Sequence, residues 1–387
     1  MPLHSLAKLS SRVATTVAKL AVVLGLVSTV VAGGLPPGSP SAMGMDPATL
    51  DSAVALYERA VAADEHRGVV LLVARRGNVV LHEVIGYSDF DHKTPLKKDA
   101  LFRMASNTKP VVATAVLMLV EEEKLALADN VRKHLSSFDN YRAGWIQIRH
   151  LLSHTSGLRM GPIFLEPLLP NTTLQKEVAR FGKRGAEVPP GTSYSYNNPG
   201  FNTLGALIEV ASGEPLEDFL AQRVYNPLGM RDSSNYESKA DQNRMSTVYS
   251  RDDIDTWKVE WRPGDEPDYP FVRASGGMIS TAADYARFCE LWRRGGDLDG
   301  TRLLGKASVQ AAWTPAPNAS WSKKVHYGYG WVHEEGRGWS HGGSDGTYAL
   351  VNPDEELIIL VFGQSRAPGI GRLRDRFIEM VHAAIVE

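Results

Sequence analysis

The stretch Leu101-Phe102-Arg103-Met104-Ala105-Ser106-Asn107-Thr108-Lys109-Pro110 and the apolar run that follows it, residues 111–120, decide the fold of this chain. Thr114 is the only polar residue of that run, which predicts a helix buried on all sides. Pro110 fits only near the start of such a helix. The sequence therefore predicts a buried helix that begins near Ser106.

Ser106 and Lys109 form an S-x-x-K pattern at the start of this helix. Residues three apart lie one turn from each other on one face, and the hydroxyl lies at the positive end of the helix dipole. A serine hydroxyl becomes a good nucleophile when a nearby base takes its proton, and a lysine can be that base if burial lowers its pKa. The pair therefore indicates a nucleophile beside an amine, while the alternative is a helix cap next to a solvated lysine.

Composition indicates an ordinary globular protein. The chain has 387 residues, 43% of them apolar, and a formal net charge of -2, enough for a large core in one or two domains. The near-zero charge and the absence of basic runs in the body of the chain argue against a nucleic-acid surface. Cys289 is the only cysteine, so no intrachain disulfide can form.

The N-terminus resembles an export signal. Residues 1–19 carry Lys8, Arg12 and Lys19 without an acidic residue, and a largely apolar run extends from Leu20 to Ala32. We expect residues 1–32 to be a signal peptide and residues 33–45 a linker, which implies a periplasmic or secreted protein. The alternatives are an uncleaved membrane anchor and an organellar transit peptide.

Helical and strand patterns lie at both ends of the remaining chain. Helices are predicted at 46–63, 148–157 and 371–386, and residues 276–288 are predicted to form a turn followed by a helix with Ser280 or Thr281 as its N-cap. Strands are predicted at 68–75, 79–86, 327–332, 347–351 and 356–362. Residues 159–190 read as an irregular, pocket-shaping segment. We predict an α+β fold in which residues 46–387 form one catalytic domain. The two terminal segments would complete an antiparallel sheet flanked by helices, and a mostly helical lobe, roughly residues 110–270, would be inserted into it.

A pair of histidines could form part of a metal site. His150 and His154 are four apart, a spacing that two zinc ligands could use, but no H-E-x-x-H arrangement or third ligand accompanies them, which favours structural histidines and no metal.

Tyr196 and Asn198 form a Y-x-N motif in a turn-rich loop. A phenol whose pKa is lowered by a lysine cation can act as a general base, and an amide two residues on can hold a substrate carbonyl. The alternative is a loop in which both residues make turn hydrogen bonds.

The segment His341-Gly342-Gly343-Ser344 leads into a predicted strand. Its glycines would let a substrate lie close to the backbone, and the N–H groups of Ser344 and Ser106 could together form an oxyanion hole. Residues 342–346 also spell G-x-S-x-G, the pattern of a nucleophile elbow, which would make Ser344 the nucleophile. That motif requires a helix after the turn, whereas a strand is predicted here.

S-x-x-K, Y-x-N and a K-T-G-like triad, in this order, resemble the serine β-lactamase and penicillin-binding-protein superfamily. Residues 151–158, 276–288 and 327–331 resemble its class C β-lactamase branch, which includes family VIII-type esterases, D-aminopeptidases and DD-peptidases. By this resemblance Ser106 would be the acylated nucleophile, Lys109 its partner, Tyr196 the general base, Asn198 a substrate contact and residues 341–343 the third motif.

The resemblance implies a serine hydrolase without cofactor or metal that acts on a small ester or amide. In the β-lactam-recognising members a lysine opens the third motif, but here that residue is His341, largely neutral at pH 7 unless perturbed. We therefore expect a carboxylesterase for short or medium acyl chains. The alternatives are a β-lactamase or peptidase acting on cell-wall-type substrates, and a binding or sensor protein that is acylated without turnover.

Overall fold

The computed structural model describes residues 34–160, 168, 171–252, 256–267 and 269–386. The predicted signal peptide, residues 1–32, lies outside the described residues, as does part of the predicted irregular segment, residues 161–167 and 169–170. All described residues belong to one structural unit, residues 31–387. Within them, no helix is both long and apolar enough to cross a membrane.

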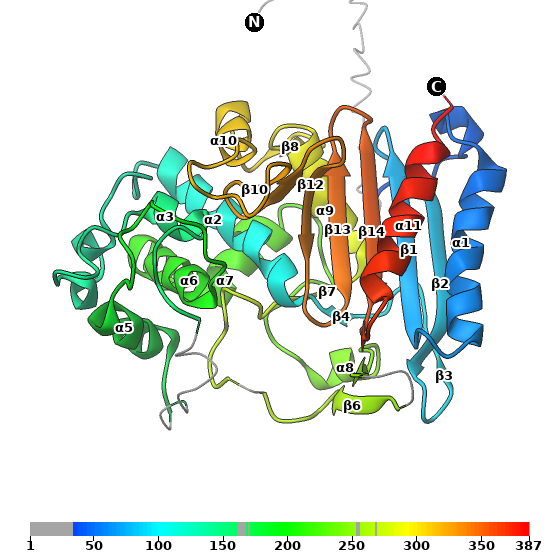
Figure 1. Ribbon diagram of the computed structural model, residues 1–387, viewed down its shortest axis with the longest axis horizontal. Helices are drawn as coiled ribbons and strands as arrows, with labels where there is room; N and C mark the ends of the chain where they lie inside the picture. Colours follow the sequence, from blue (N-terminus) through cyan, green and yellow to red (C-terminus); the bar gives the residue numbers. More distant parts are fainter. Residues whose placement is uncertain (1–33, 161–167, 169–170, 253–255, 268, 387) are drawn as a thin grey trace, which may run out of the picture. The chain divides into compact units, whose positions relative to one another are not determined.

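The two ends of the chain together form an eight-stranded antiparallel sheet, as predicted (Figure 1). The strand order is β10-β11-β12-β13-β14-β1-β2-β3, so the first strand of the chain lies beside one of the last, with Val69 opposite Gly363. The strands are β1 Gly68–Arg75, β2 Asn78–Asp89, β3 Thr94–Pro95, β10 Val325–Tyr327, β11 Val332–Glu334, β12 Gly338–Gly342, β13 Thr347–Asn352 and β14 Leu357–Gly363.

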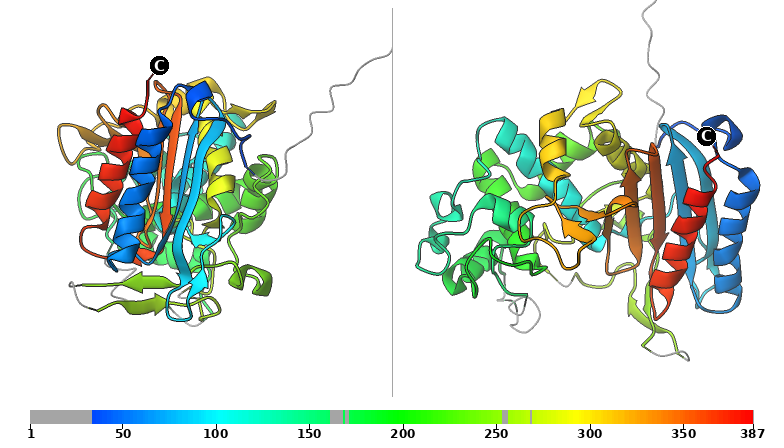
Figure 2. Two further views of the ribbon diagram at one scale, coloured as in Figure 1. Left: turned by 90° about the vertical axis from the view of Figure 1, so that its right-hand side faces the viewer. Right: turned by 45° about the horizontal axis from the view of Figure 1, so that its top comes forward.

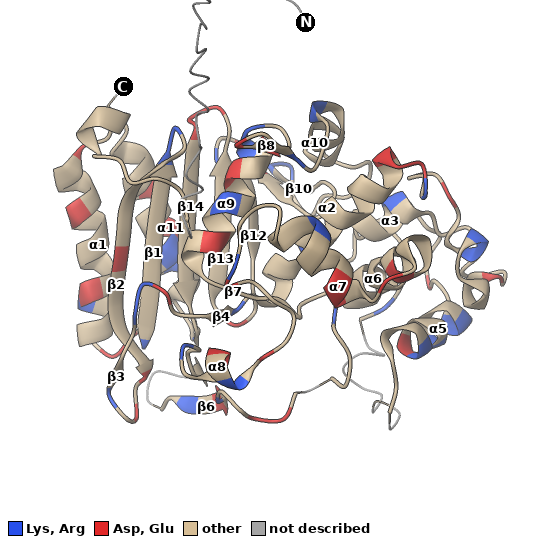
Figure 3. Cartoon of the chain, turned by 180° about the vertical axis from the view of Figure 1, so that it is seen from behind, with Lys and Arg blue, Asp and Glu red and all other residues tan. Residues whose placement is uncertain are grey.

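Both faces of the sheet are covered, which explains why the central strands are apolar at nearly every position. Alternate residues of β1 enter opposite cores: Leu71 faces helices α1 (Pro47–Ala62) and α11 (Ile370–Ala383), and Leu72 belongs to the core of the other face. Helices α1 and α11 lie side by side on the first face (Figure 2). Helix α9 (Ala282–Arg293) packs against β1, β13 and β14 on the second (Figure 3).

The inserted lobe packs around the predicted buried helix, α2 (Thr108–Glu121), in which every residue from Thr108 to Leu119 is buried. Its other helices include α3 Ile148–Leu152, α5 Leu174–Arg184, α6 Asn198–Ser212 and α7 Leu216–Leu220, and a π-helical turn spans Ala221–Tyr225. The short helix α8 (Lys239–Gln242) lies apart from these, below the sheet (Figure 1). The prediction that residues 159–190 are irregular is wrong for α5, whose buried residues include Leu174, Val178 and Phe181. Helix α3 also ends earlier than predicted, at Leu152 and not at Gly157.

Short strands connect the lobe to the sheet region. β4 (Phe102–Arg103) pairs with β7 (Ile279–Ser280), and β5 (Val248–Ser250) lies between β6 (Lys258–Trp261) and β15 (Ser365–Arg366). Beyond α9, the hairpin β8 (Asp297–Leu298) and β9 (Thr301–Arg302) precedes α10 (Lys306–Ala312). The predicted strand 327–332 is instead two strands, β10 and β11. The chain turns between them because Gly330 has a positive φ of 80°.

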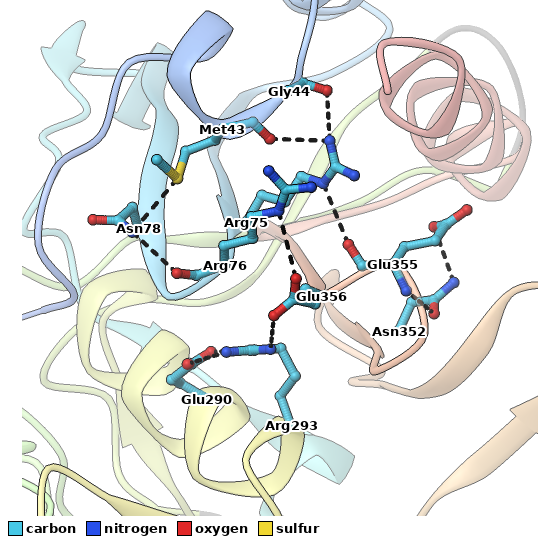
Figure 4. A network of polar contacts seen from close by, with 10 residues as sticks. All are labelled: Met43, Gly44, Arg75, Arg76, Asn78, Glu290, Arg293, Asn352, Glu355 and Glu356. Carbon is cyan, nitrogen blue, oxygen red and sulfur yellow. Dashed lines mark hydrogen bonds and ion pairs between the residues drawn. The ribbon is translucent and has the colours of Figure 1, made fainter. Parts of the chain in front are cut away.

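The segment expected to be a linker is bound to the sheet. Its Pro36 carbonyl accepts a hydrogen bond from the Val79 N–H, and the 3-10 turn Ser41–Met43 lies beside Arg75, whose guanidinium donates to the carbonyls of Met43 and Gly44. Figure 4 shows this contact as part of a polar network that continues from Arg76 through Glu356 to Arg293 on α9. The network joins the N-terminal segment, two turns of the sheet and α9.

Thr281 is the N-cap of α9, one of the two residues predicted for this role: its hydroxyl accepts a hydrogen bond from the Asp284 N–H at 3.1 Å. Thr281→Ala is expected to lower the free energy of unfolding by about 1 kcal/mol, because a buried N–H loses its acceptor. Urea denaturation of the two proteins would measure the difference. Thr281→Ser keeps the hydroxyl and should recover most of the loss; equal stability of the alanine variant and the parent would contradict the capping role.

Candidate active site

Ser106 lies in a tight turn between β4 and α2. The turn is a 3-10 segment, Ala105–Asn107, and Ala105 before the serine has a positive φ of 44°, a conformation that is strained for a residue with a side chain. Thr108 holds the turn, because its hydroxyl donates to the Ala105 carbonyl at 2.7 Å and accepts from the Met278 N–H at 3.0 Å. The surrounding chain thus fixes the backbone on both sides of Ser106.

Lys109 is fully buried and its amine has two neighbours. Its Nζ lies 2.9 Å from Ser106 Oγ and 2.7 Å from the carbonyl oxygen of Ser275. Burial, followed by the charge of Arg273, holds the pKa of this amine well below its ordinary value. A neutral amine of this kind can take a proton from a hydroxyl. The sequence predicted the pair but gave no sign of the Ser275 carbonyl, which is 166 residues away.

Tyr196 reaches the same hydroxyl from the inserted lobe: its Oη lies 2.8 Å from Ser106 Oγ. The next residue, Asn197, is the N-cap of α6 and accepts from the Gly200 N–H, so the start of this helix positions the tyrosine. The ring of His154 packs 4.2 Å from that of Tyr196, and its Nδ1 accepts from the Asn197 N–H. His154 is therefore a structural neighbour of the site that spacing alone did not place there.

One electrostatic expectation for Tyr196 is wrong. We expected a lysine cation to lower the pKa of the phenol, but burial raises the pKa of Tyr196 while it lowers the pKa of Lys109. The reason is that both groups lie in the same water-poor environment, which disfavours ammonium and phenolate alike. Electrostatics therefore favours a neutral amine as the base and a neutral phenol as a group that passes a proton on.

His341 is buried on β12 with both ring nitrogens engaged. Its Nδ1 lies 2.9 Å from the Gly342 carbonyl, which can only accept, so the ring donates from Nδ1 and its Nε2 accepts from the Tyr327 hydroxyl at 2.9 Å. Burial, followed by the charge of Lys109, lowers the pKa of His341 to about 3. The third motif therefore carries no positive charge from this residue at neutral pH.

The loop after His341 approaches the Ser106 turn. A Cβ on Gly343 would lie 2.4 Å from the Met104 carbonyl oxygen, so this glycine permits close packing of the protein against itself, whereas we expected it to admit substrate. Gly342 is exposed. Ser344 is followed by strand β13 and not by a helix, and its hydroxyl donates to Asp345, so the geometry of a nucleophile elbow is not formed.

Asp345, which the sequence did not single out, fixes this loop. Its buried carboxylate forms an ion pair with Arg103 at 3.1 Å and another with Arg366, and Gln364 donates to its carbonyl. Arg103 is three residues before Ser106. The contact therefore ties the loop that carries Ser344 to the strand that leads into the nucleophile turn.

The other residues singled out in the sequence are Asn198 and the histidine pair, His150 and His154. Asn198 is the first residue of α6; its N–H donates to the Met160 sulfur, and its buried side-chain oxygen has no partner among the described residues. His150 accepts from the Gln147 N–H, so both histidines of the possible zinc pair bind backbone amides. In the described part of the chain no group of three or more His, Cys, Asp or Glu side chains could hold a metal ion.

The chain is similar in sequence to curated proteins with different names. Penicillin-binding protein 4* of Bacillus subtilis is 29% identical over 313 residues, 76% of this chain and 67% of the relative. Esterase EstB of Burkholderia gladioli is 34% identical over 212 residues, 50% of this chain and 53% of the relative. The chain spans 66% of the length of two further curated relatives, from Mycobacterium tuberculosis.

The fold matches a solved structure over most of its length. EstCE1, described as a hydrolase with promiscuous acyltransferase activity, superposes with a TM-score of 0.77 at 22% identity, covering 87% of this chain and 99% of that one. The family model described as Beta-lactamase matches residues 53–383. This range includes the Ser106 turn, the Tyr196 loop and the strand of His341. The chain therefore belongs to the Beta-lactamase family of serine hydrolases.

Proposed function

We propose that this protein is a carboxylesterase that acts through an acyl-enzyme on Ser106, with esters of short or medium acyl chains as substrates. The observation that carries the proposal is the convergence of Lys109 Nζ and Tyr196 Oη on Ser106 Oγ, at 2.9 and 2.8 Å. An activated hydroxyl beside two proton-transfer groups is what acyl transfer requires. The likeness to an esterase, EstB, supports the choice of substrate.

In the proposed reaction, Lys109 takes the proton of Ser106 while Oγ attacks the ester carbonyl carbon. The N–H groups of Ser106 and Ser344 hold the oxyanion, and Tyr196 passes a proton to the leaving alkoxide oxygen. The Lys109 ammonium returns its proton to Tyr196, which leaves the amine neutral. A water molecule then attacks the acyl carbon and its proton goes to the amine, which passes this proton to Ser106 Oγ as the bond between Oγ and the acyl carbon breaks and the acid is released. Asn198, His341 and Gly342 would line the bound substrate, while Gly343 packs against the nucleophile turn.

The neutral state of His341 favours an ester over a β-lactam. A substrate carboxylate at the third motif would meet an uncharged imidazole whose two nitrogens are already bonded within the protein. A charge-assisted hydrogen bond contributes about 1.5 to 3 kcal/mol, so its absence would weaken recognition of an anionic drug by about ten- to a hundredfold. The likeness to a penicillin-binding protein keeps a β-lactamase or D-peptidase as the second candidate.

Hydrolysis of p-nitrophenyl butyrate and of a chromogenic cephalosporin, measured side by side, tests the proposal. We expect steady turnover of the ester and little or no turnover of the cephalosporin. Cephalosporin hydrolysis without ester cleavage would establish the second candidate instead. A single burst of p-nitrophenol, with a stable adduct on Ser106 by intact mass, would show an acylated binding protein. Protein carrying Ser106→Ala controls for spontaneous hydrolysis.

A further inference from the structure

A cavity of about 510 Å³ lies between the inserted lobe and the short strands β6 and β7. Its volume falls in the range of pockets that enclose drug-sized molecules. Ser106 is not among the residues that line the cavity, and the residues at the inner end of the cavity connect it to the nucleophile turn. The residues that matter here are Met245, Trp261, Tyr269, Phe271, Gly276 and Met278.

Gly276 connects the cavity to the nucleophile turn. A Cβ added to this glycine would lie 3.5 Å from the carbonyl carbon of Ala105, the atom bonded to the Ser106 nitrogen. The residue before it, Ser275, is the one whose carbonyl contacts the Lys109 amine. Arg273 also lines the cavity and is close enough to lower the pKa of Lys109. The inner end of the cavity therefore lies against the backbone that leads into Ser106, next to the residue whose carbonyl contacts the Lys109 amine.

The charged groups around the cavity are engaged within the protein. Arg103 pairs with Asp345 and lies over the Trp261 ring, with its Cζ 4.7 Å from the ring centroid. The three acidic residues of the lining also accept hydrogen bonds from the protein: Glu209 from Gln175, Glu217 from Tyr236 and Glu237 from the Gly264 N–H. Arg273, the second arginine of the lining, lies over the Tyr269 ring, with its Cζ 4.2 Å from the ring centroid. An anionic ligand would face three carboxylates and two arginines that already contact aromatic rings. Apolar and aromatic side chains make up much of the remaining wall.

We propose that this cavity holds the acyl group of the substrate, and that this group is neutral and bulky, with an aromatic or branched body. The inference rests on the proposed function, which defines the ester bond that is broken, and it adds which kind of acyl group that ester carries. Gly276 sets the size of the entrance, because any larger side chain there would project between the cavity and the nucleophile turn. Its φ lies outside the left-handed region and the nearest atom to an added Cβ is at an ordinary contact distance, so a substitution should not strain the backbone.

The role of the cavity is tested first by binding of an ester that cannot be turned over. Methyl 2-naphthoate, a neutral fluorescent ester, should bind to the Ser106→Ala protein, and adding Gly276→Leu should weaken that binding by about tenfold or more. Phe271→Ala removes an aromatic wall without adding volume and should also weaken it. Gly371→Leu is the matched control, because a side chain on this exposed glycine of α11 would meet nothing within 4 Å. Circular dichroism confirms that each variant is folded.

In the protein with Ser106 intact, the readout is the ratio of kcat/KM for p-nitrophenyl 2-naphthoate to that for p-nitrophenyl acetate. Gly276→Leu should lower this ratio by about ten- to a hundredfold. Hydrolysis of both esters with an unchanged ratio, or naphthoate binding that is independent of Gly276 and Phe271, would overturn the inference while leaving the proposed esterase intact. Gly276-dependent binding without turnover of any ester would support the cavity and overturn the esterase.

Discussion

Replacing Ser106 by alanine is expected to lower kcat/KM for p-nitrophenyl butyrate by about ten-thousandfold or more, the size of effect that follows the loss of a catalytic nucleophile. The variant should fold normally. It loses one hydroxyl, whereas the turn around it is held by Thr108 and by the Asn107 amide, which donates to Thr347 at 2.9 Å. We expect the melting temperature to stay within about 2 °C of the parent.

Covalent labelling identifies the nucleophile independently of any substrate. A fluorophosphonate should add one adduct to the parent protein, and peptide mapping should place it on Ser106. Ser344→Ala should be labelled at the same residue, because the Ser344 hydroxyl donates to Asp345 and the elbow geometry is not formed. Undiminished hydrolysis by Ser106→Ala would move the nucleophile elsewhere, with Ser344 the first residue to examine.

The parts of the fold that could be predicted are those in which local pattern and long-range packing agree. The run 111–120 is apolar on every side because α2 is enclosed by the sheet region and the lobe, and the strand 68–75 is continuously apolar because both faces of the sheet are covered. Helix α5 was missed because proline- and leucine-rich flanking segments obscured its periodicity, although Leu174, Val178 and Phe181 lie on one face at helical spacing.

The residues of the site could be named from the sequence, but their electrostatics could not. Motif spacing indicates Ser106, Lys109 and Tyr196, yet the protonation of each group depends on burial and on neighbours far along the chain, such as the Ser275 carbonyl beside the amine. His341 illustrates this most clearly, because its neutral form is fixed by the Tyr327 hydroxyl and by the surrounding core. Gly343 looks like a substrate-facing glycine in the sequence and proves to be a packing glycine.

Lys109→Met is expected to lower kcat/KM for p-nitrophenyl butyrate by about a thousandfold, the upper part of the range for losing a general base. It should also remove the acid limb of the pH profile. In the parent protein kcat/KM should rise with pH as the amine of Lys109 loses its proton. The rise should level off well below the pKa of an ordinary lysine, because that of Lys109 is lowered. Tyr196 and His341 should add no transition between pH 5 and 9, since their pKa values are raised and lowered away from this range.

The lowered pKa of Lys109 also predicts that Lys109→Met, which removes activity, makes the folded protein more stable. At pH 7 an unfolded lysine is protonated, whereas Lys109 in the folded protein favours the neutral amine, so folding must release a proton and the free energy of unfolding should rise with pH up to the unfolded pKa. Methionine has a similar length and carries no proton, so Lys109→Met should raise the melting temperature at pH 7 while it removes activity. Urea unfolding of both proteins at pH 6 and pH 9 would measure this. If the stability of the parent relative to the variant did not rise between pH 6 and pH 9, the amine would be held as a cation in the folded protein, and Lys109 could not then be the base.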